Sequence, residues 1–203
     1  MVTNWRFLNM NIKDWKREVF TIPNLLSLFR LLLIPVYMTI YLNARTDSDY
    51  ILSAVILAAS CLTDLFDGKI ARHFNMISSV GKVLDPLADK LTQFTLMVCL
   101  AVRFPFLWYL VAFFFVKEIF QLVAGFINLR KGRMLKGALI TGKISTTILF
   151  ISLVIMVLVP RIPENVVLVI AIVDGVFLLA AFIDYALTYY FRPDKFNYFD
   201  ANK

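Results

Sequence analysis

The chain has 203 residues, of which 60% are apolar, and its formal net charge is +7. Its mean hydropathy of +0.76 is too high for a soluble domain of this length, which would need far more polar surface. The basic residues gather at the ends of apolar runs, so the charge indicates cytoplasmic loops and contact with anionic lipid rather than nucleic-acid binding. The two cysteines lie inside apolar runs without CxxC spacing, which argues against a disulfide framework or a zinc site.

Residues 4–20 have an amphipathic pattern. Apolar side chains recur there every three or four residues, whereas the basic ones fall mainly elsewhere. The apolar set is Leu8, Ile12, Trp15 and Val19. This pattern predicts a helix that lies in the headgroup layer of a membrane. The alternative is an ordinary helix that packs on protein.

Six apolar stretches follow, each of about the twenty residues needed to cross ~30 Å of hydrocarbon. We expect them near residues 25–43, 50–72, 80–102, 106–128, 139–159 and 165–190. The predicted fold is an all-α integral membrane protein, with six transmembrane helices preceded by the N-terminal amphipathic helix. No internal repeat stands out, so we expect one domain over residues 1–203. Its parts are a juxtamembrane helix at 1–22, a six-helix bundle at 23–190 and a cytoplasmic tail at 191–203.

Basic residues in the connections predict the orientation of the spans. The 69–82 connection holds three lysines or arginines and the 130–143 connection holds five, whereas the opposite connections hold one arginine each. By the positive-inside rule, both termini then face the cytoplasm. We expect the membrane to be a bacterial plasma membrane.

Four aspartates occupy the two span ends that flank the 69–82 connection. Asp64 and Asp67 are i,i+3 neighbours, and Asp85 and Asp89 are i,i+4 neighbours, so on helices each pair shares one face. A short connection makes the two spans antiparallel, and the four acids are expected to meet in one pocket at the cytoplasmic side. Uncompensated carboxylates there are costly unless they are protonated or bind metal. Oxygen ligands without histidine or cysteine select hard cations such as Mg²⁺, Mn²⁺ or Ca²⁺.

The residues around the acids favour phosphoryl-transfer chemistry. Gly68 and Gly81 allow a bulky ligand to approach the backbone, and the guanidinium of Arg72 suits a phosphate. One alternative is that the acids are solvated helix ends paired with nearby lysines. Another is a divalent-cation transporter, although the other half of the chain offers no matching ladder of acids.

The complete pattern is D-x2-D-G-x2-A-R-x8-G-x3-D-x3-D, with every fixed position filled between Asp64 and Asp89. It resembles the signature of the CDP-alcohol phosphotransferase (CDP-alcohol phosphatidyltransferase) family. The stretches "TIPNLLSLFRLLLIP" at 21–35, "LDPLADK" at 84–90 and "TGKIST" at 141–146 extend the resemblance. Within this family, the chain is most similar to phosphatidylglycerophosphate synthases and CDP-dependent cardiolipin synthases.

The resemblance implies a reaction and a role for each signature residue. A phosphatidyl group would pass from CDP-diacylglycerol to an alcohol, with release of CMP. Asp64, Asp67 and Asp85 would bind two Mg²⁺ or Mn²⁺ ions, while Asp89 would complete the metal site and act as the general base. The residues implied to line the cytidine diphosphate pocket are Gly68, Ala71, Arg72 and Gly81. The resemblance also implies a homodimer.

The acceptor alcohol is less constrained by the sequence. Glycerol 3-phosphate is an anion that needs basic side chains. The candidates are Lys136, Lys143, Lys117 and Arg130. Of these, Lys143 best matches the family, with Lys136 as a second contact. Phosphatidylglycerophosphate synthases commonly carry an arginine where this chain has Gly125 and a lysine where it has Ser145. We expect glycerol 3-phosphate as the acceptor, with phosphatidylglycerol, which gives cardiolipin, as the alternative.

Lys117 and Glu118 lie deep in the fourth predicted span, where charges are usually paired or functional. Adjacent residues on a helix point apart, so we expect each to find a partner on another helix. Asp174 and Asp184 in the sixth predicted span are the candidates.

Overall fold

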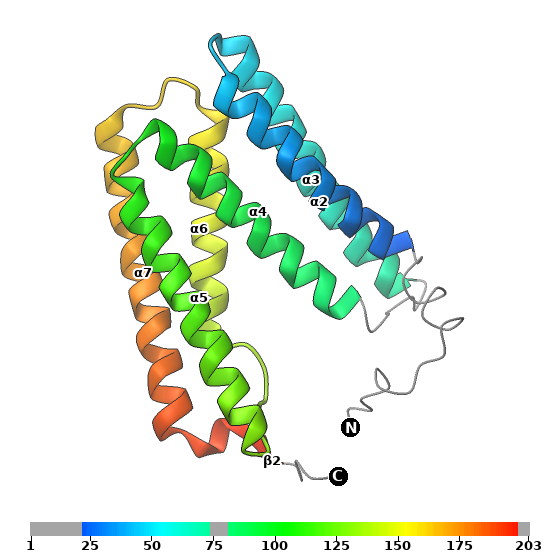
Figure 1. Cartoon of the computed structure of the whole chain (residues 1–203), viewed down its shortest axis with the longest axis vertical. Coiled ribbons are helices and arrows are strands. Elements are labelled where there is room, and N and C mark those ends of the chain that lie inside the picture. Colours follow the sequence, from blue (N-terminus) through cyan, green and yellow to red (C-terminus); the bar gives the residue numbers. More distant parts are fainter. Residues whose placement is uncertain (1–21, 74–80, 199–203) are drawn as a thin grey trace. The chain divides into compact units, whose positions relative to one another are not determined.

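The computed structural model describes the backbone of residues 22–73 and 81–198, and the side chains of residues 24–63, 85 and 87–198. Six α-helices dominate this part of the chain (Figure 1). They are α2 (Ile22–Asn43), α3 (Asp47–His73), α4 (Gly81–Arg103), α5 (Leu107–Arg130), α6 (Ile140–Leu158) and α7 (Glu164–Phe191). The six predicted apolar stretches are therefore confirmed as helices. The predicted amphipathic helix at 4–20 lies outside the described residues.

Four of the described helices are long and apolar enough to cross a membrane: α2, α5, α6 and α7. Their outward faces expose large apolar side chains, such as Leu122 on α5 and Val169 on α7. An aqueous surface would rarely carry so many, whereas lipid accepts them. These features are those of a membrane protein. That α3 and α4 also cross the membrane stays a prediction.

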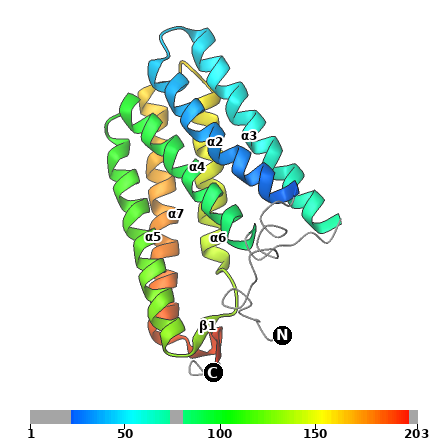
Figure 2. The same cartoon turned by 45° about the vertical axis from the view of Figure 1, so that its right-hand side comes forward.

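The chain divides into two compact units, residues 1–99 and 100–203. In the first unit, α2 and α3 form an antiparallel helical hairpin that Figure 2 shows from a second side. Asp49 fixes the turn between them, because its Oδ2 accepts the backbone N–H groups of Arg45 and Thr46, both at 2.9 Å. These hydrogen bonds hold the pKa of the Asp49 carboxyl below its usual value. The start of α2 lies against the first turns of α4 through the side-chain bonds described below.

In the second unit, α7 packs against both α5 and α6 (Figures 1 and 2). Aromatic rings fill the α5–α7 contact, where the Phe120 ring lies 4.9 Å from that of Phe182 and 6.4 Å from that of Tyr189. Gly142 of α6 brings its backbone close to the buried ring of Tyr185 on α7. A side chain larger than hydrogen would clash there.

A small antiparallel strand pair was not predicted, so the all-α expectation is corrected in this detail. Strand β1 (Arg133–Leu135) pairs with β2 (Phe196–Tyr198), which follows the 3₁₀ turn η2 (Pro193–Lys195). Gly132 allows the chain to leave α5 with φ of 69°. Three-residue strands are too short to give a period-two pattern, which is why the sequence did not reveal them.

Candidate active site

Two of the four predicted acids make side-chain bonds to the start of α2. Asp85 accepts a hydrogen bond from Ser27 Oγ at 2.6 Å, and Asp89 forms an ion pair with Arg30 Nη1 at 2.6 Å. Ser27 and Arg30 are buried, with 0% and 2% of their surface exposed. Asp85 and Asp89 are four residues apart on α4, and their partners Ser27 and Arg30 are three residues apart on α2. The two acids therefore share one face of α4, as predicted. The structure brings Asp85 and Asp89 together on the side of α4 that faces α2.

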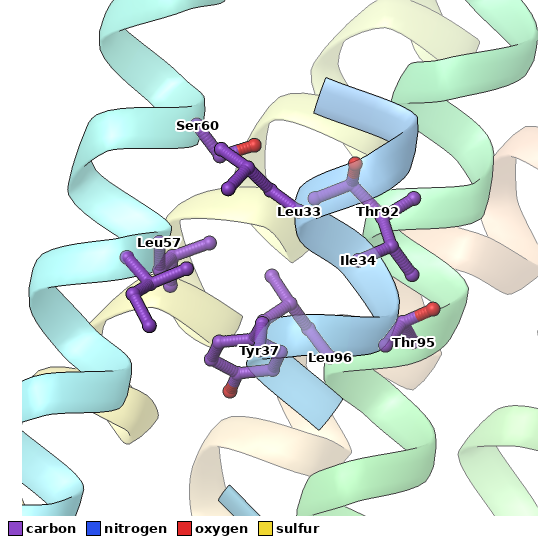
Figure 3. A pocket seen from close by; sticks show the side chains of 9 residues that line it. Leu33, Ile34, Tyr37, Leu57, Ser60, Thr92, Thr95 and Leu96 are labelled. Atoms are coloured by element: carbon purple, nitrogen blue, oxygen red, sulfur yellow. The ribbon is translucent and has the colours of Figure 1, made fainter. Parts of the chain in front are cut away.

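A small pocket lies directly beyond these bonds, between α2, α3 and α4 (Figure 3). The lining residues are Leu33, Ile34 and Tyr37 from α2, Ile56, Leu57 and Ser60 from α3, and Thr92, Thr95 and Leu96 from α4. Because these residues line one pocket, they show which turns of α2, α3 and α4 lie side by side.

The same alignment gives the positions of the helix turns that carry the other two acids, Asp64 and Asp67. Beyond Ser60, the next turn of α3 carries Asp64 and the turn after it Asp67. Because α2 and α3 are antiparallel, the matching turns of α2 are those of Arg30 and then Ser27. The backbone thus places all four acid-bearing turns at one end of the unit. The side chains of Asp64 and Asp67 lie outside the described residues, so the four-acid pocket stays a prediction.

The predicted cytidine diphosphate residues fall in the last turns of α3 and the first turn of α4. They are Gly68, Ala71, Arg72 and Gly81, and their side chains also lie outside the described residues. Their backbone positions follow the two acids of α3 and precede the two acids of α4. Their role in binding cytidine diphosphate stays a prediction.

Ser27 and Arg30 are the functional candidates that the sequence analysis missed. With Asn24 they occupy positions i, i+3 and i+6 of a helix whose other residues from Ile22 to Val36 are apolar, and all three are buried. Polar side chains on one face of an apolar span usually meet protein or water rather than lipid. This spacing was the available signal, and it lies within the "TIPNLLSLFRLLLIP" stretch.

The described donor set fits a hard cation but does not complete its coordination. Asp85 and Asp89 supply carboxylate oxygens, the ligands that Mg²⁺ and Mn²⁺ prefer. Asp89 already pairs with a positive group, the guanidinium of Arg30. Among residues with described side chains, no group of three or more acids, histidines or cysteines gathers around one point. A metal centre here needs the carboxylates of Asp64 and Asp67.

The predicted acceptor lysines belong to the second unit. Lys136 donates from Nζ to the backbone carbonyl of Asp194 at 2.6 Å, and its N–H donates to the carbonyl of Lys195 at 3.0 Å. Lys143 is exposed near the start of α6. Lys136 is therefore tied to the segment before β2, whereas Lys143 is exposed on the second unit. An acceptor role for either lysine stays a prediction.

The expectation for Lys117 and Glu118 is wrong. Lys117 Nζ donates to Glu118 Oε1 at 2.8 Å, and the two side chains are only 2% and 10% exposed. Both side chains are long enough to curl along the helix surface and meet, although their Cβ atoms point apart. The adjacent pair thus forms a buried ion pair within α5.

The two aspartates expected as their partners are bonded elsewhere. Asp174 accepts a hydrogen bond from Ser152 Oγ at 2.9 Å across the α6–α7 contact. Asp184 accepts from Thr141 Oγ1 at 2.6 Å and pairs with Arg192 at 2.8 Å. Both aspartates therefore help to join α7 to neighbouring segments of the second unit.

A model of the CDP-alcohol phosphatidyltransferase family matches residues 20–185. The match includes the four acids of the signature and the α2 residues that contact two of them. The chain belongs to the CDP-alcohol phosphatidyltransferase family. This finding confirms the resemblance that the signature indicated.

Curated relatives in this family have two kinds of name. The CDP-diacylglycerol–glycerol-3-phosphate 3-phosphatidyltransferase of Rickettsia bellii is 44% identical over 71 residues, which are 34% of this chain and 38% of that protein. The enzyme of the same name from Escherichia coli is 37% identical over 89 residues, 44% of this chain and 48% of that protein. The cardiolipin synthase (CMP-forming) of Streptomyces coelicolor is 40% identical over 89 residues, 42% of this chain and 41% of that protein. The chain thus spans less than half the length of each of these relatives.

Proposed function

We propose that this protein transfers the phosphatidyl group of CDP-diacylglycerol to an alcohol and releases CMP. The observation that carries the proposal is the family match over residues 20–185, which contains the complete acid signature. The first unit supports it, because α4 presents Asp85 and Asp89 toward α2 at the level of the α3 turns that bear Asp64 and Asp67. The reaction needs carboxylates at one point, and the helix turns that carry the four acids lie at one end of the first unit, which supports the proposal.

In this proposal Asp64, Asp67 and Asp85, completed by Asp89, hold two divalent cations, Mg²⁺ or Mn²⁺. When bound, such ions offset the charge of a diphosphate and of a departing phosphate oxygen. Gly68, Ala71 and Gly81 leave room for the nucleotide against the helices, and Arg72 offers its guanidinium to a phosphate. The support is the all-oxygen chemistry of the acids and the signature spacing.

Asp89 is the proposed general base. Its carboxylate accepts the proton of the acceptor hydroxyl while that oxygen forms a bond to the phosphorus of the phosphatidyl group. The bond from this phosphorus to the CMP oxygen breaks, and the electron pair leaves with CMP. Half of the Asp89 side chain (52%) is exposed, so a hydroxyl can reach it despite the ion pair with Arg30.

For the acceptor we propose glycerol 3-phosphate, whose phosphate Lys143 would contact with help from Lys136. Two relatives whose names include glycerol 3-phosphate support this choice. Phosphatidylglycerol is the second candidate, and two positions favour it. Gly125 has the hydroxyl of Tyr189 3.5 Å from where its Cβ would lie, and Ser145 is 1% exposed, so neither position supplies a cation to an open acceptor site.

We further propose six transmembrane helices, an interfacial helix at 4–20, and termini and active site on the cytoplasmic side of a bacterial plasma membrane. The support is the positive charge of the 69–82 and 130–143 connections together with the four apolar described helices. A homodimer is proposed from the family resemblance.

The test is turnover by the purified full-length protein in detergent. CDP-diacylglycerol is supplied with Mg²⁺ or Mn²⁺ and with glycerol 3-phosphate, phosphatidylglycerol or no acceptor, and CMP and the lipid product are measured. We expect phosphatidylglycerophosphate, no CMP in EDTA, and no CMP from Asp85→Asn. Asp47→Asn, at the opposite end of α3, is the matched control and should keep wild-type turnover. Formation of cardiolipin without phosphatidylglycerophosphate would instead identify phosphatidylglycerol as the acceptor. Divalent-cation flux into vesicles without CMP release would instead mean a transporter.

A further inference from the structure

The segments that follow α5 and α7 are strongly basic. Residues 130–143 hold five lysines and arginines and no acid, and residues 192–195 hold two more with one acid, Asp194. All seven basic residues are exposed. Arg192 pairs with Asp184, whereas Arg130, Lys131 and Arg133 form no ion pair within the part of the chain that the structure describes. These three cations are therefore available to an anionic partner.

The β1–β2 pair holds this basic segment in a defined place on the second unit. Strand β1 contacts α5, and η2, which leads into β2, contacts α7 (Figure 2). Phe196 of β2 is 5% exposed, and its ring lies 6.0 Å from that of Tyr189 on α7. Across the strands Arg133 is the register partner of Tyr198. The basic segment is thus part of the folded unit.

Two of the arginines lie over aromatic rings. The guanidinium carbon of Arg130 is 4.6 Å from the centre of the Phe126 ring, and that of Arg133 is 5.6 Å from the centre of the Tyr198 ring. Both rings are more than half exposed, so the stacked pairs lie at the surface. Stacking restricts a guanidinium and leaves the N–H groups at its edge available to a phosphate.

The same surface lies where the apolar faces of α5 and α7 end. Both helices have the length and composition of membrane spans. Ile127 is exposed in the last turn of α5, and Tyr190 and Phe191 are exposed at the end of α7. Exposed aromatic rings followed by lysines and arginines are typical of the layer between hydrocarbon and lipid headgroups. The cations therefore lie at the depth of the headgroup phosphates.

We propose that Arg130, Lys131 and Arg133, carried by the end of α5 and by β1, bind the headgroup of an anionic phospholipid. The two stacked guanidiniums donate N–H groups to the phosphate oxygens, and the ammonium of Lys131 adds a charge that favours lipids with a net negative charge. The acyl chains lie along the exposed apolar face of α5 next to Phe126. None of the signature acids takes part, so the proposal is independent of the proposed function.

The test is the affinity of the purified full-length protein in detergent for phosphatidylserine, with phosphatidylcholine as the comparison. Radiolabelled lipid retained by the immobilised protein gives the dissociation constant. The two lipids share a phosphodiester and differ by one net charge. Phosphatidylserine should bind about fivefold or more tightly, and about 1 M NaCl should reduce this difference. Equal affinities for the two lipids would overturn the proposal.

Arg130→Gln/Arg133→Gln removes both stacked guanidiniums and should weaken phosphatidylserine binding by about tenfold or more. Arg45→Gln/Arg161→Gln is the matched control, because it removes the same charge from two exposed arginines in other connections. The control should bind within about twofold of wild type. Equal weakening in both double variants would mean an effect of net charge alone and would overturn the site.

Folding of each variant is checked by circular dichroism and by its melting temperature. Arg130→Lys/Arg133→Lys keeps the charges but loses the forked, stacked donors. Its affinity for phosphatidylserine should lie between those of the wild type and the glutamine variant. This second variant keeps the proposal testable if the glutamine variant does not fold.

Glycerol 3-phosphate separates a lipid site from a site for a free phosphate. It carries a phosphate without acyl chains, so an excess of it should leave phosphatidylserine bound. Displacement of the lipid by glycerol 3-phosphate would assign Arg130 and its neighbours to the acceptor site and overturn the proposal. Absence of CMP release by the wild type would count against the proposed function, whereas the lipid comparison would still judge this site.

Discussion

Replacing Lys117 by methionine should strongly destabilise the second unit, because the change removes the cation that pairs with the buried carboxylate of Glu118. Helix α5 has 24 residues and is therefore about 36 Å long. Lys117 lies ten residues after Leu107, the first residue of α5, which is about 15 Å along a helix that must cross ~30 Å of hydrocarbon. The pair thus sits near the middle of the span, where water is least available.

The magnitude follows from burial. Lys117 is 2% and Glu118 10% exposed, and their charged atoms are 2.8 Å apart. Breaking a buried ion pair by removing one partner costs about 3–5 kcal/mol, whereas replacing both partners by neutral groups is often close to neutral. Lys117→Met and Glu118→Gln should therefore each lower the free energy of unfolding by about 3 kcal/mol or more. The double variant should lose much less than the sum of the two.

The assay is a double-mutant cycle on unfolding in mixed detergent micelles, followed by circular dichroism. The Asp184–Arg192 pair is the matched control, because its side chains are 21% and 45% exposed. Its coupling energy should stay below about 1 kcal/mol, as expected of a solvent-accessible pair. If Lys117→Met unfolds within about 1 kcal/mol of wild type, or if the two pairs have equal coupling energies, the argument from burial is refuted.

Four other changes have defined outcomes. Gly142→Ala places a methyl group 2.7 Å from the ring of Tyr185 and should lower the free energy of unfolding by about 1–3 kcal/mol in a thermal melt. Asp89→Asn should reduce kcat by about 10²–10⁴-fold in the CMP-release assay while CDP-diacylglycerol still binds. Lys143→Ala should raise the acceptor KM by about tenfold or more, since a charge-assisted hydrogen bond contributes roughly 1.5–3 kcal/mol, and should leave the CDP-diacylglycerol KM nearly unchanged. The pKa of Asp49 in the folded protein is below the 3.8 of a free carboxyl. The contribution of Asp49 to the stability of the α2–α3 turn is therefore complete above pH 3.8 and is lost as the pH falls through the folded pKa. Amide hydrogen exchange at the start of α3 should accelerate at that acidic pH.

Each of these outcomes has a control. Gly137→Ala introduces a methyl group with no atom within 4 Å and should be neutral, so equal effects at both glycines would contradict the steric argument. Asp89→Asn turning over within a few-fold of wild type would place the base elsewhere. An equal rise in both KM values for Lys143→Ala would argue against a specific acceptor contact. Asp49→Asn should abolish the acid-dependent acceleration, and its persistence would assign that acceleration to another group.

The helices could be predicted because their signal is local. Runs of about twenty apolar residues separated by charged connections specify where each helix begins and ends, and the observed bounds agree within a few residues. The β1–β2 pair could not be predicted in this way. Its strands have three residues each and lie more than sixty residues apart, so neither periodicity nor proximity in the sequence connects them.

The part of the site that lies within one continuous segment of the sequence could be predicted. The acids of α4 were expected on one face from their spacing, and the structure places Asp85 and Asp89 there. Their partners on α2 are 58 and 59 residues away in the sequence, and no spacing rule states which helix faces which. The prediction that Lys117 and Glu118 have partners on another helix was wrong for another reason. The prediction used the directions of Cβ atoms, whereas long side chains end several bonds away and can meet around the helix.

The buried arginine on α2 also bears on the charge balance of the proposed site. The carboxylates of the signature exceed the guanidiniums of Arg30 and Arg72 by two negative charges. Two divalent cations would reverse this excess to two positive charges, and the diphosphate of CDP-diacylglycerol, with two negative charges, would return the total to zero. Without Arg30 the loaded site would carry a net negative charge and would repel an anionic acceptor such as glycerol 3-phosphate. A cation on α2 would therefore favour the binding of an anionic acceptor, and Arg30→Met should raise the KM of such an acceptor more than that of CDP-diacylglycerol.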